Sequence, residues 1–170
     1  MQEAKPKKIA IIGAGKYGSA LVTVFQDSNV NLDIVIWTRQ ADKADEINIQ
    51  RTSANVSPLI KFNQRVRATT NLEECYSDAD FIVLSLPSAN LSEFLTENKA
   101  KFSPKSFFVN TAKGMLIKTG QFVHQMFGEI FPNEMDRYIV LSGPSFADDM
   151  FKKSPTLVLL SGKNKEKVRE

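Results

Sequence analysis

The residues with the clearest chemical potential form a glycine-rich stretch near the start of the sequence. Residues 13–18 read GAGKYG and match the pattern G-x-G-x-x-G. They follow a short apolar run and precede a helical pattern, which is the context in which this motif binds a dinucleotide. There, Gly13 permits a tight turn, Gly15 lets the backbone approach a pyrophosphate, and Gly18 allows close packing of helix on strand. The stretch predicts an NAD or NADP site; the alternative is a structural turn that binds nothing.

The end of the second apolar run is expected to choose between the two cofactors. An Asp or Glu at that point binds the ribose 2′-hydroxyl of NAD, but the sequence reads Trp37-Thr38-Arg39. Arg39 is suited to pair with the 2′-phosphate of NADP and to stack on the adenine. One charge-assisted hydrogen bond, worth about 1.5–3 kcal/mol, would favour NADP roughly tenfold or more. The alternative is an arginine in solvent, and we expect Trp37 in the core.

Two further strand ends carry candidate groups for a substrate. Lys113 follows the fifth apolar run, where its ammonium would polarise a carbonyl or hold a phosphate; the alternative is an exposed lysine on a turn. After the sixth run, Gly143 would bring bare backbone close to a ligand and Pro144 would begin a helix. Ser145 would add a hydroxyl and N–H groups at that helix N-terminus, which is a polar corner for a ligand or simple helix capping.

These candidates require a scaffold that brings strand ends to one edge. Apolar runs typical of buried strands alternate with helical patterns, which predicts a Rossmann-type α/β fold. We expect a doubly wound, mostly parallel sheet with helices on both faces, which binds ligands at the carboxyl ends of its strands. The predicted strands are residues 8–13, 32–38, 66–69, 80–86, 106–111, 138–142 and 156–161. The predicted helices are residues 17–26, 41–51, 71–76, 91–98, 119–131 and 145–152.

Composition excludes several other classes of protein. The 170 residues are 42% hydrophobic, enough for one domain with a sizeable core. A net charge of +3 without a basic stripe argues against nucleic acid, and no apolar stretch approaches the roughly 20 residues of a membrane span. The single cysteine, Cys75, fits a reducing compartment such as the cytoplasm. No His or Cys spacing predicts a metal site. We expect residues 1–7 to be a flexible tail and residues 8–170 to be the nucleotide-binding domain.

Several stretches together resemble one family, in order and at compatible spacings. They read IIGAGKYGSAL, VIWTR, LSLPS, NTAKG, VLSGPSFADDM and PTLVLLS. With them the chain resembles the N-terminal domain of bacterial NAD(P)-dependent glycerol-3-phosphate dehydrogenase. The resemblance implies reduction of dihydroxyacetone phosphate to sn-glycerol 3-phosphate for phospholipid synthesis, in the cytoplasm and in a possible homodimer. The rival interpretations are a related dehydrogenase acting on another oxo or hydroxy acid, and a non-catalytic nucleotide-sensing module.

The resemblance also assigns roles to individual positions. Its nucleotide contacts fall on Lys16, Tyr17, Arg39, Lys113 and Ala147. Its substrate contacts fall on Lys113, Gly143 and Ser145. The catalytic base of the family is a lysine in a helical C-terminal domain, expected beyond residue 170. We therefore expect this chain to bind nucleotide with little or no turnover, and to expose an apolar patch that favours self-association.

Overall fold

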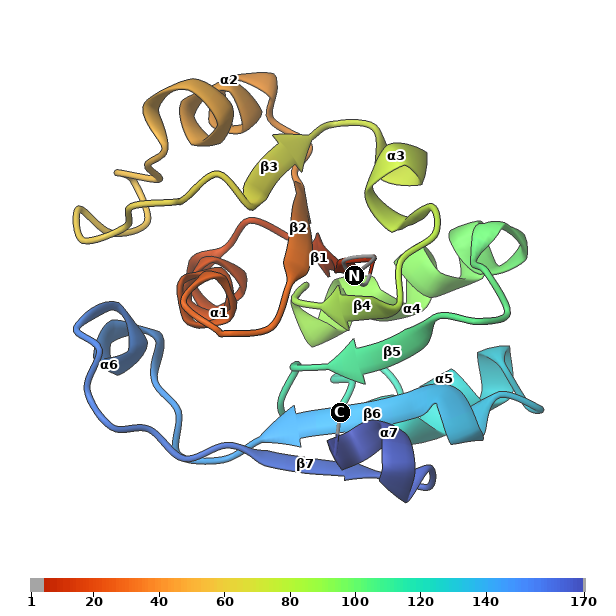
Figure 1. Cartoon of the computed structure of the whole chain (residues 1–170). Helices are drawn as coiled ribbons and strands as arrows, with labels where there is room; N and C mark the ends of the chain where they lie inside the picture. Colours follow the sequence, from red (N-terminus) through yellow and green to blue (C-terminus); the bar gives the residue numbers. More distant parts are fainter. Residues whose placement is uncertain (1–4, 170) are drawn as a thin grey trace.

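The described part of the computed structural model, residues 5–169, is built on a seven-stranded sheet with the order β3-β2-β1-β4-β5-β6-β7 (Figure 1). Strands β1 to β6 are parallel, and β7 runs antiparallel to β6 at the edge. The strands are β1 (Lys7–Ile12), β2 (Leu32–Trp37), β3 (Val66–Thr69), β4 (Phe81–Leu84), β5 (Phe107–Asn110), β6 (Tyr138–Ser142) and β7 (Leu159–Gly162). The predicted doubly wound, mostly parallel sheet is confirmed.

Helices cover both faces of this sheet (Figure 1). They are α1 (Lys16–Gln26), α2 (Ala41–Asp45), α3 (Leu72–Tyr76), α4 (Ser88–Asn98), α5 (Val123–Ile130), α6 (Ala147–Phe151) and α7 (Lys165–Arg169). The core on one face joins β1 residues Ile9 and Ile11 to α1, α2 and α6. The core on the other face joins Ala10 and Ile12 to α3, α4 and α5. Both faces of the strand are buried, which explains why its sequence is continuously apolar.

Several predicted boundaries are wrong. Lys7 belongs to β1 rather than to a tail, because its N–H donates to the Asn31 carbonyl at 3.0 Å; residues 1–4 of the predicted tail lie outside the described part. The predicted helix over 41–51 continues from α2 as a π-helical segment, Glu46–Gln50. The predicted helix over 119–131 begins only at Val123. Before it, residues 115–122 form a turn in which the Leu116 N–H donates to the Gln121 carbonyl at 2.8 Å.

The sixth helix also begins later than its sequence indicates. The sequence predicts a helix over residues 145–152, but α6 starts at Ala147 with Phe146 as its N-cap. Pro144 and Ser145 therefore lie in the connection after β6 and not in a first helical turn. The φ angle of Phe146 is −90° and its ψ is 140°, an extended backbone that precedes the helix. The N–H of Ser145 donates instead to the Gly143 carbonyl at 2.9 Å.

An irregular segment and the single cysteine both contribute to the core. Residues 52–64, which include Pro58, contain turns but no helix or strand, and Ile60 and Phe62 are buried there. Cys75 is buried within α3, and burial raises the pKa of its thiol to about 12. A thiol with so high a pKa is almost entirely protonated near neutrality, so it packs as a small apolar side chain. Within the described residues no helix combines the length and the hydropathy that crossing a membrane requires.

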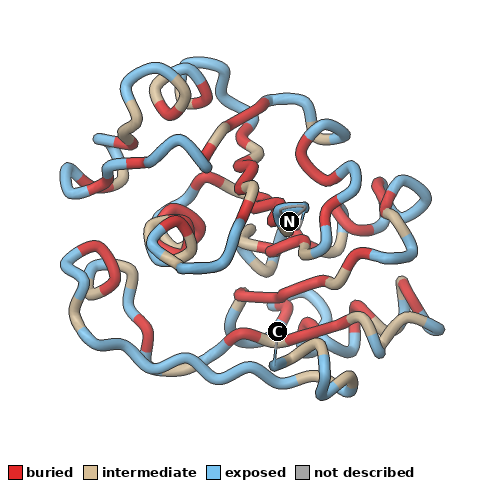
Figure 2. The backbone as a smooth tube through the Cα atoms, viewed as in Figure 1, coloured by how far each residue is buried: buried red, intermediate tan, exposed pale blue. Residues whose placement is uncertain are grey.

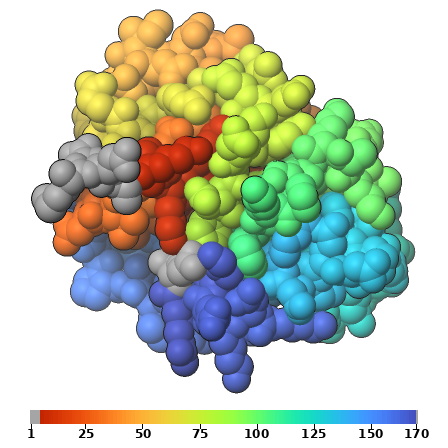
Figure 3. Space-filling model, turned by 45° about the vertical axis from the view of Figure 1, so that its right-hand side comes forward, coloured from red at the N-terminus to blue at the C-terminus, as the bar shows by residue number. Residues whose placement is uncertain are grey.

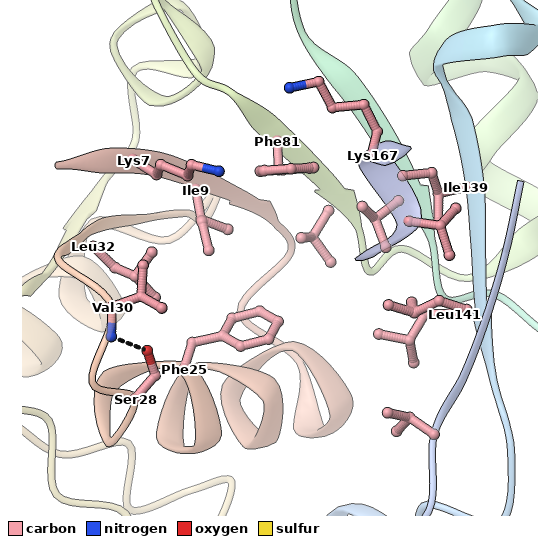
Figure 4. A pocket seen from close by; sticks show the side chains of 15 residues that line it. Lys7, Ile9, Phe25, Ser28, Val30, Leu32, Phe81, Ile139, Leu141 and Lys167 are labelled. Atoms are coloured by element: carbon pink, nitrogen blue, oxygen red, sulfur yellow. Dashed lines mark hydrogen bonds between the residues drawn. The ribbon is translucent and has the colours of Figure 1, made fainter. Parts of the chain in front are cut away.

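The expected apolar surface lies along β7 and beside it. Leu157 and Leu159 are 59% and 60% exposed, and Figure 2 shows this edge strand as largely exposed. An apolar groove of about 290 Å³ lies next to it, between α1, the sheet and α7. Figure 4 shows Ile9, Phe81 and Leu141 on the sheet side of this groove. In Figure 3 the C-terminal segment, dark blue, projects at the lower edge of the surface.

Candidate functional site

The glycine-rich loop after β1 depends on the absence of side chains at two positions. Gly13 has a φ of +115°, and a Cβ atom there would lie 2.7 Å from the Ser85 carbonyl oxygen. A Cβ atom at Gly18 would lie 2.3 Å from the Gly13 carbonyl oxygen. Both distances are shorter than van der Waals contact allows. The tight turn at Gly13 and the close packing at Gly18 are therefore confirmed as structural requirements.

Gly15 differs from the other two glycines, because a Cβ atom there would meet nothing within 4 Å. Gly15 is the N-cap of α1, and no side chain caps this helix end. The first N–H groups of a helix have no partner within the helix, and together with the helix dipole they favour an anion. The open space at Gly15 and the uncapped helix end thus fit a bound pyrophosphate.

Four strand ends meet at one cavity of about 460 Å³, which we name the strand-end hollow. Its lining comes from the segments that follow β1, β4, β5 and β6: Gly15, Lys16, Tyr17, Ser85, Leu86, Pro87, Thr111, Ala112, Lys113, Ser145, Phe146 and Ala147. A parallel sheet places the carboxyl ends of these strands along one edge, which is why segments distant in sequence converge here. The structure therefore brings most of the predicted site residues together.

Lys113 reaches across the strand-end hollow from the segment after β5. Its Nζ donates to the Gly143 carbonyl at 3.3 Å, so it links the ends of β5 and β6. The side chain is exposed, and an ammonium group carries more N–H groups than this single bond uses. Lys113 can therefore keep its bond to Gly143 and donate to a ligand oxygen at the same time.

Ser145 is less free than its sequence position indicates. It is only 2% exposed, and its Oγ lies 2.8 Å from the hydroxyl oxygen of Tyr17 in the glycine-rich loop. Its place at a helix N-terminus, as expected from sequence, is wrong because α6 begins two residues later. The Ser145 hydroxyl instead fastens the glycine-rich loop to the connection after β6, and a ligand would share that hydroxyl with Tyr17.

The expectation that Gly143 presents bare backbone to a ligand needs a correction as well. Gly143 has a φ of +125°, and a Cβ atom there would lie 2.6 Å from the Leu157 carbonyl oxygen. The close neighbour of its Cα is thus the chain itself, in the segment leading to β7. What Gly143 offers toward the hollow is its carbonyl oxygen, which accepts from Lys113 and from the Ser145 N–H.

Lys16 and Ala147 lie where the glycine-rich loop meets α6. The Lys16 Nζ forms an ion pair with Asp148 at 2.8 Å, and both side chains are more than half exposed. Asp148 lies in the first turn of α6, as expected for a carboxylate that favours the helix dipole. An exposed ion pair contributes at most about 1 kcal/mol, so Lys16 can leave Asp148 for a phosphate at small cost.

Arg39 lies outside the strand-end hollow, in a neighbouring cavity of about 360 Å³ that we name the Arg39 hollow. Its lining consists of Trp37, Arg39, Leu72, Leu86, Asn90, Glu93, Phe94, Glu97 and Asn98. Leu86 lines both hollows, so they adjoin at the end of β4. Trp37 is half-buried, packs its ring 6.0 Å from that of Phe94 and donates to the Thr70 carbonyl. It packs against the core and also lines this hollow, so the expected core position is only partly correct.

Comparison with known proteins gives the family. A family model described as the NAD-dependent glycerol-3-phosphate dehydrogenase N-terminus matches residues 8–168. The chain belongs to this family. It is 36% identical to the glycerol-3-phosphate dehydrogenase [NAD(P)+] of Carboxydothermus hydrogenoformans, over 95% of this chain and 47% of that protein. It is 35% identical to the enzyme of that name from Leptospira biflexa, over 92% and 47%. The chain thus spans about half the length of these relatives.

Solved structures agree with this family at the level of the fold. The crystal structure of glycerol-3-phosphate dehydrogenase from Coxiella burnetii superposes with a TM-score of 0.84 at 24% identity, covering 96% of this chain and 49% of that one. Prephenate dehydrogenase from A. aeolicus superposes less well, with a TM-score of 0.63 at 13% identity. The Rossmann-type architecture is therefore shared widely, and its neighbours include dehydrogenases with other substrates.

Two residues that help to build this family domain's site were missed by sequence reasoning. Asn110 and Thr111 are buried at the end of β5. The Thr111 hydroxyl donates to the Leu84 carbonyl at 3.0 Å, and the Asn110 side chain both donates to the Ala112 carbonyl and accepts from the Ala112 N–H. These bonds fix the backbone just before Lys113. The available signal was two polar residues at the end of a buried apolar run, because buried polar groups need partners.

The described residues offer no metal centre. Between residues 5 and 169, no three His, Cys, Asp or Glu side chains lie close enough to hold a metal ion. His124 is exposed on α5, where its ring stacks on that of Phe122 at 5.8 Å. The buried face of α5 carries Val123, Met126 and Phe127, and His124 lies outside that face.

Proposed function

We propose that this chain is the nucleotide-binding half of a glycerol-3-phosphate dehydrogenase that reduces dihydroxyacetone phosphate to sn-glycerol 3-phosphate for glycerophospholipid synthesis in the cytoplasm. The observation that carries the proposal is the strand-end hollow, where the glycine-rich loop, Lys113 and Ser145 meet around one cavity. Membership of the family and the name of the relatives, glycerol-3-phosphate dehydrogenase [NAD(P)+], support this choice of substrate. The bound cofactor would supply a hydride to the substrate carbonyl carbon.

The cofactor assignment rests on the shape of the glycine-rich loop. Gly13 and Gly18 shape the turn, while Gly15 leaves room for the pyrophosphate beside the uncapped end of α1. Lys16 and Tyr17 border that space, and Lys113 and Ala147 line the far side of the same hollow. Lys16 and Lys113 are the charged residues of this lining, which contains no Asp or Glu, so it would attract an anionic dinucleotide.

Lys113 is the residue that we assign to the substrate carbonyl. Its ammonium is tethered to the Gly143 carbonyl, so it is held over the hollow while its remaining N–H groups stay available. A donor held in advance toward a developing negative charge typically contributes about 2.7–4 kcal/mol to transition-state stabilisation. Ser145 and the Gly143 carbonyl complete the polar side of the substrate site, with Ser145 sharing its hydroxyl with Tyr17.

We propose that Arg39 gives the site a preference for NADP over NAD. Arg39 is exposed at the end of β2, and within residues 5–169 its guanidinium has no hydrogen bond or ion pair. Because Arg39 has no partner there, it can bind a 2′-phosphate without first breaking a bond to another residue. The position matches the point at which Rossmann-type domains distinguish the two cofactors.

We further propose that residues 8–170, with Lys7 added to the first strand, form the nucleotide domain of a two-domain enzyme. A helical C-terminal domain would supply the base lysine and most of the grip on the substrate phosphate. This chain alone would then bind nucleotide and turn over very slowly or not at all. Its exposed apolar edge at Leu157 and Leu159 would favour self-association, including a homodimer.

A titration tests the proposal directly. NADPH and NADH are added to the chain, with and without dihydroxyacetone phosphate, and nicotinamide fluorescence is followed. We expect both nucleotides to bind, NADPH more tightly, and the affinity to shift when dihydroxyacetone phosphate is present. Binding that responds instead to another oxo acid would favour a related dehydrogenase. A chain that binds neither nucleotide would refute the proposal.

A further inference from the structure

Recognition of a 2′-phosphate requires a positive charge, but the Arg39 hollow also contains two negatively charged side chains. One helix, α4, contributes Asn90, Glu93 and Glu97 to its lining, at spacings of three and four residues that place them along one stripe of the helix. Arg39 enters the same hollow from the end of β2. The hollow therefore combines one guanidinium with two carboxylates around an apolar floor of Trp37 and Phe94.

The polar side chains of the Arg39 hollow are available to bind a ligand. Among residues 5–169, the side chains of Arg39, Asn90, Glu93 and Glu97 have neither hydrogen bonds nor ion pairs with one another or with other residues. All four residues are exposed, so their charged forms remain solvated. They are held near one another by the fold without neutralising one another through direct contact, and a ligand entering the hollow would meet all of them.

The two cofactors differ here only in the group on the ribose. NADP brings a 2′-phosphate that carries nearly two negative charges, whereas NAD brings a neutral hydroxyl. Arg39 attracts the phosphate, and the two carboxylates repel it. The hydroxyl of NAD meets no such repulsion, because a carboxylate can accept its hydrogen bond. The glutamates therefore counteract the attraction of Arg39 for NADP, but they do not repel NAD.

We propose that Glu93 and Glu97 limit the preference for NADP that Arg39 creates, so that the same site also accepts NAD. This inference rests on the proposed function, since it requires the adenosine end of the cofactor to lie in the Arg39 hollow. Opposite charges around one hollow would give a physical reason for a domain to accept both cofactors.

The test compares NADPH and NADH dissociation constants for the wild-type chain and for Glu93→Gln, Glu97→Gln and the double variant. Glutamine keeps the shape of each side chain and removes the charge. Interactions between exposed charges are weak, so we expect the double variant to bind NADPH roughly three- to tenfold more tightly. NADH affinity should change by less than about twofold, and the gain for NADPH should shrink as salt rises.

Glu166→Gln is the matched control, because it removes the same charge from an exposed position on α7, outside both hollows. It should leave the ratio of the two dissociation constants unchanged. If the double variant binds both nucleotides but keeps the wild-type ratio, or weakens both equally, the inference is overturned while the proposed function stands. If the wild-type chain binds neither nucleotide, both fail together.

Discussion

The strand-end hollow and the Arg39 hollow share Leu86 but are built in different ways. Around the first, buried polar groups are fastened to each other: Thr111 donates to the Leu84 carbonyl, and Ser145 pairs with Tyr17. Around the second, charged side chains are exposed and have no partner among residues 5–169. Chemistry requires atoms fixed to a fraction of an ångström, whereas attraction between charges acts over several ångströms. The strand-end hollow is therefore suited to a reaction, and the Arg39 hollow to distinguishing between ligands of different charge.

The largest expected effect comes from the loop that borders the first hollow. Gly18→Ala places a Cβ atom 2.3 Å from the Gly13 carbonyl oxygen, so the backbone of the loop has to shift. We expect a loss of about 4 kcal/mol or more in the free energy of unfolding, with nucleotide binding lost as well. Urea denaturation measures the first and NADH titration the second.

Gly15→Ala is the matched control for that variant. A Cβ atom there meets nothing within 4 Å, and replacing glycine at an N-cap changes stability by about 1 kcal/mol or less. The chain should therefore fold normally and still bind NADH poorly, because the methyl group occupies the space for the pyrophosphate. Normal NADH binding by Gly15→Ala would show that the loop does not approach the cofactor.

Lys113→Ala tests whether the first hollow performs chemistry. Lys113 is exposed and makes one side-chain hydrogen bond, at 3.3 Å, so the free energy of unfolding should barely change. In an enzyme that contains both domains, kcat/KM should fall by about 10²- to 10³-fold. Lys118→Ala, on the exposed turn that follows, provides the control and should keep full activity. Equal activity of the two variants would remove Lys113 from the site.

The bond between Tyr17 and Ser145 gives the smallest of these effects. Tyr17→Phe leaves the buried Ser145 hydroxyl without its partner, at a cost of about 1–3 kcal/mol. Ser145→Ala leaves the half-buried Tyr17 hydroxyl without its partner and should cost less, because that hydroxyl borders the hollow. The double variant should cost less than the sum of the two, because both remove the same interaction. Chemical denaturation of all four chains measures the coupling. Additive losses would mean that this bond does not fasten the loop, and the contrast between the hollows would weaken.

The sequence predicted those features that depend on the residues of one short stretch alone. The alternation of apolar runs and helical patterns predicted the sheet, and the spacing of Gly13 and Gly18 predicted a turn and a close contact that the structure contains. It failed at Ser145, whose small neighbours resembled a helix start, and at Gly143, whose close neighbour Leu157 lies in a later segment. Neither partner can be inferred from local spacing, because both contacts join segments distant in the chain.

By itself, the sequence determined the fold class, the position of the glycine-rich loop and the family, since periodicity and glycine spacing are local properties of the chain. Only the tertiary structure decided which polar groups are free to act. In it, the Ser145 hydroxyl is hydrogen-bonded to that of Tyr17, and Lys113 keeps N–H groups that make no bond. Glu93 and Glu97 line the same hollow as Arg39. Those outcomes depend on how helices and strands far apart in sequence pack against each other, which no local pattern encodes.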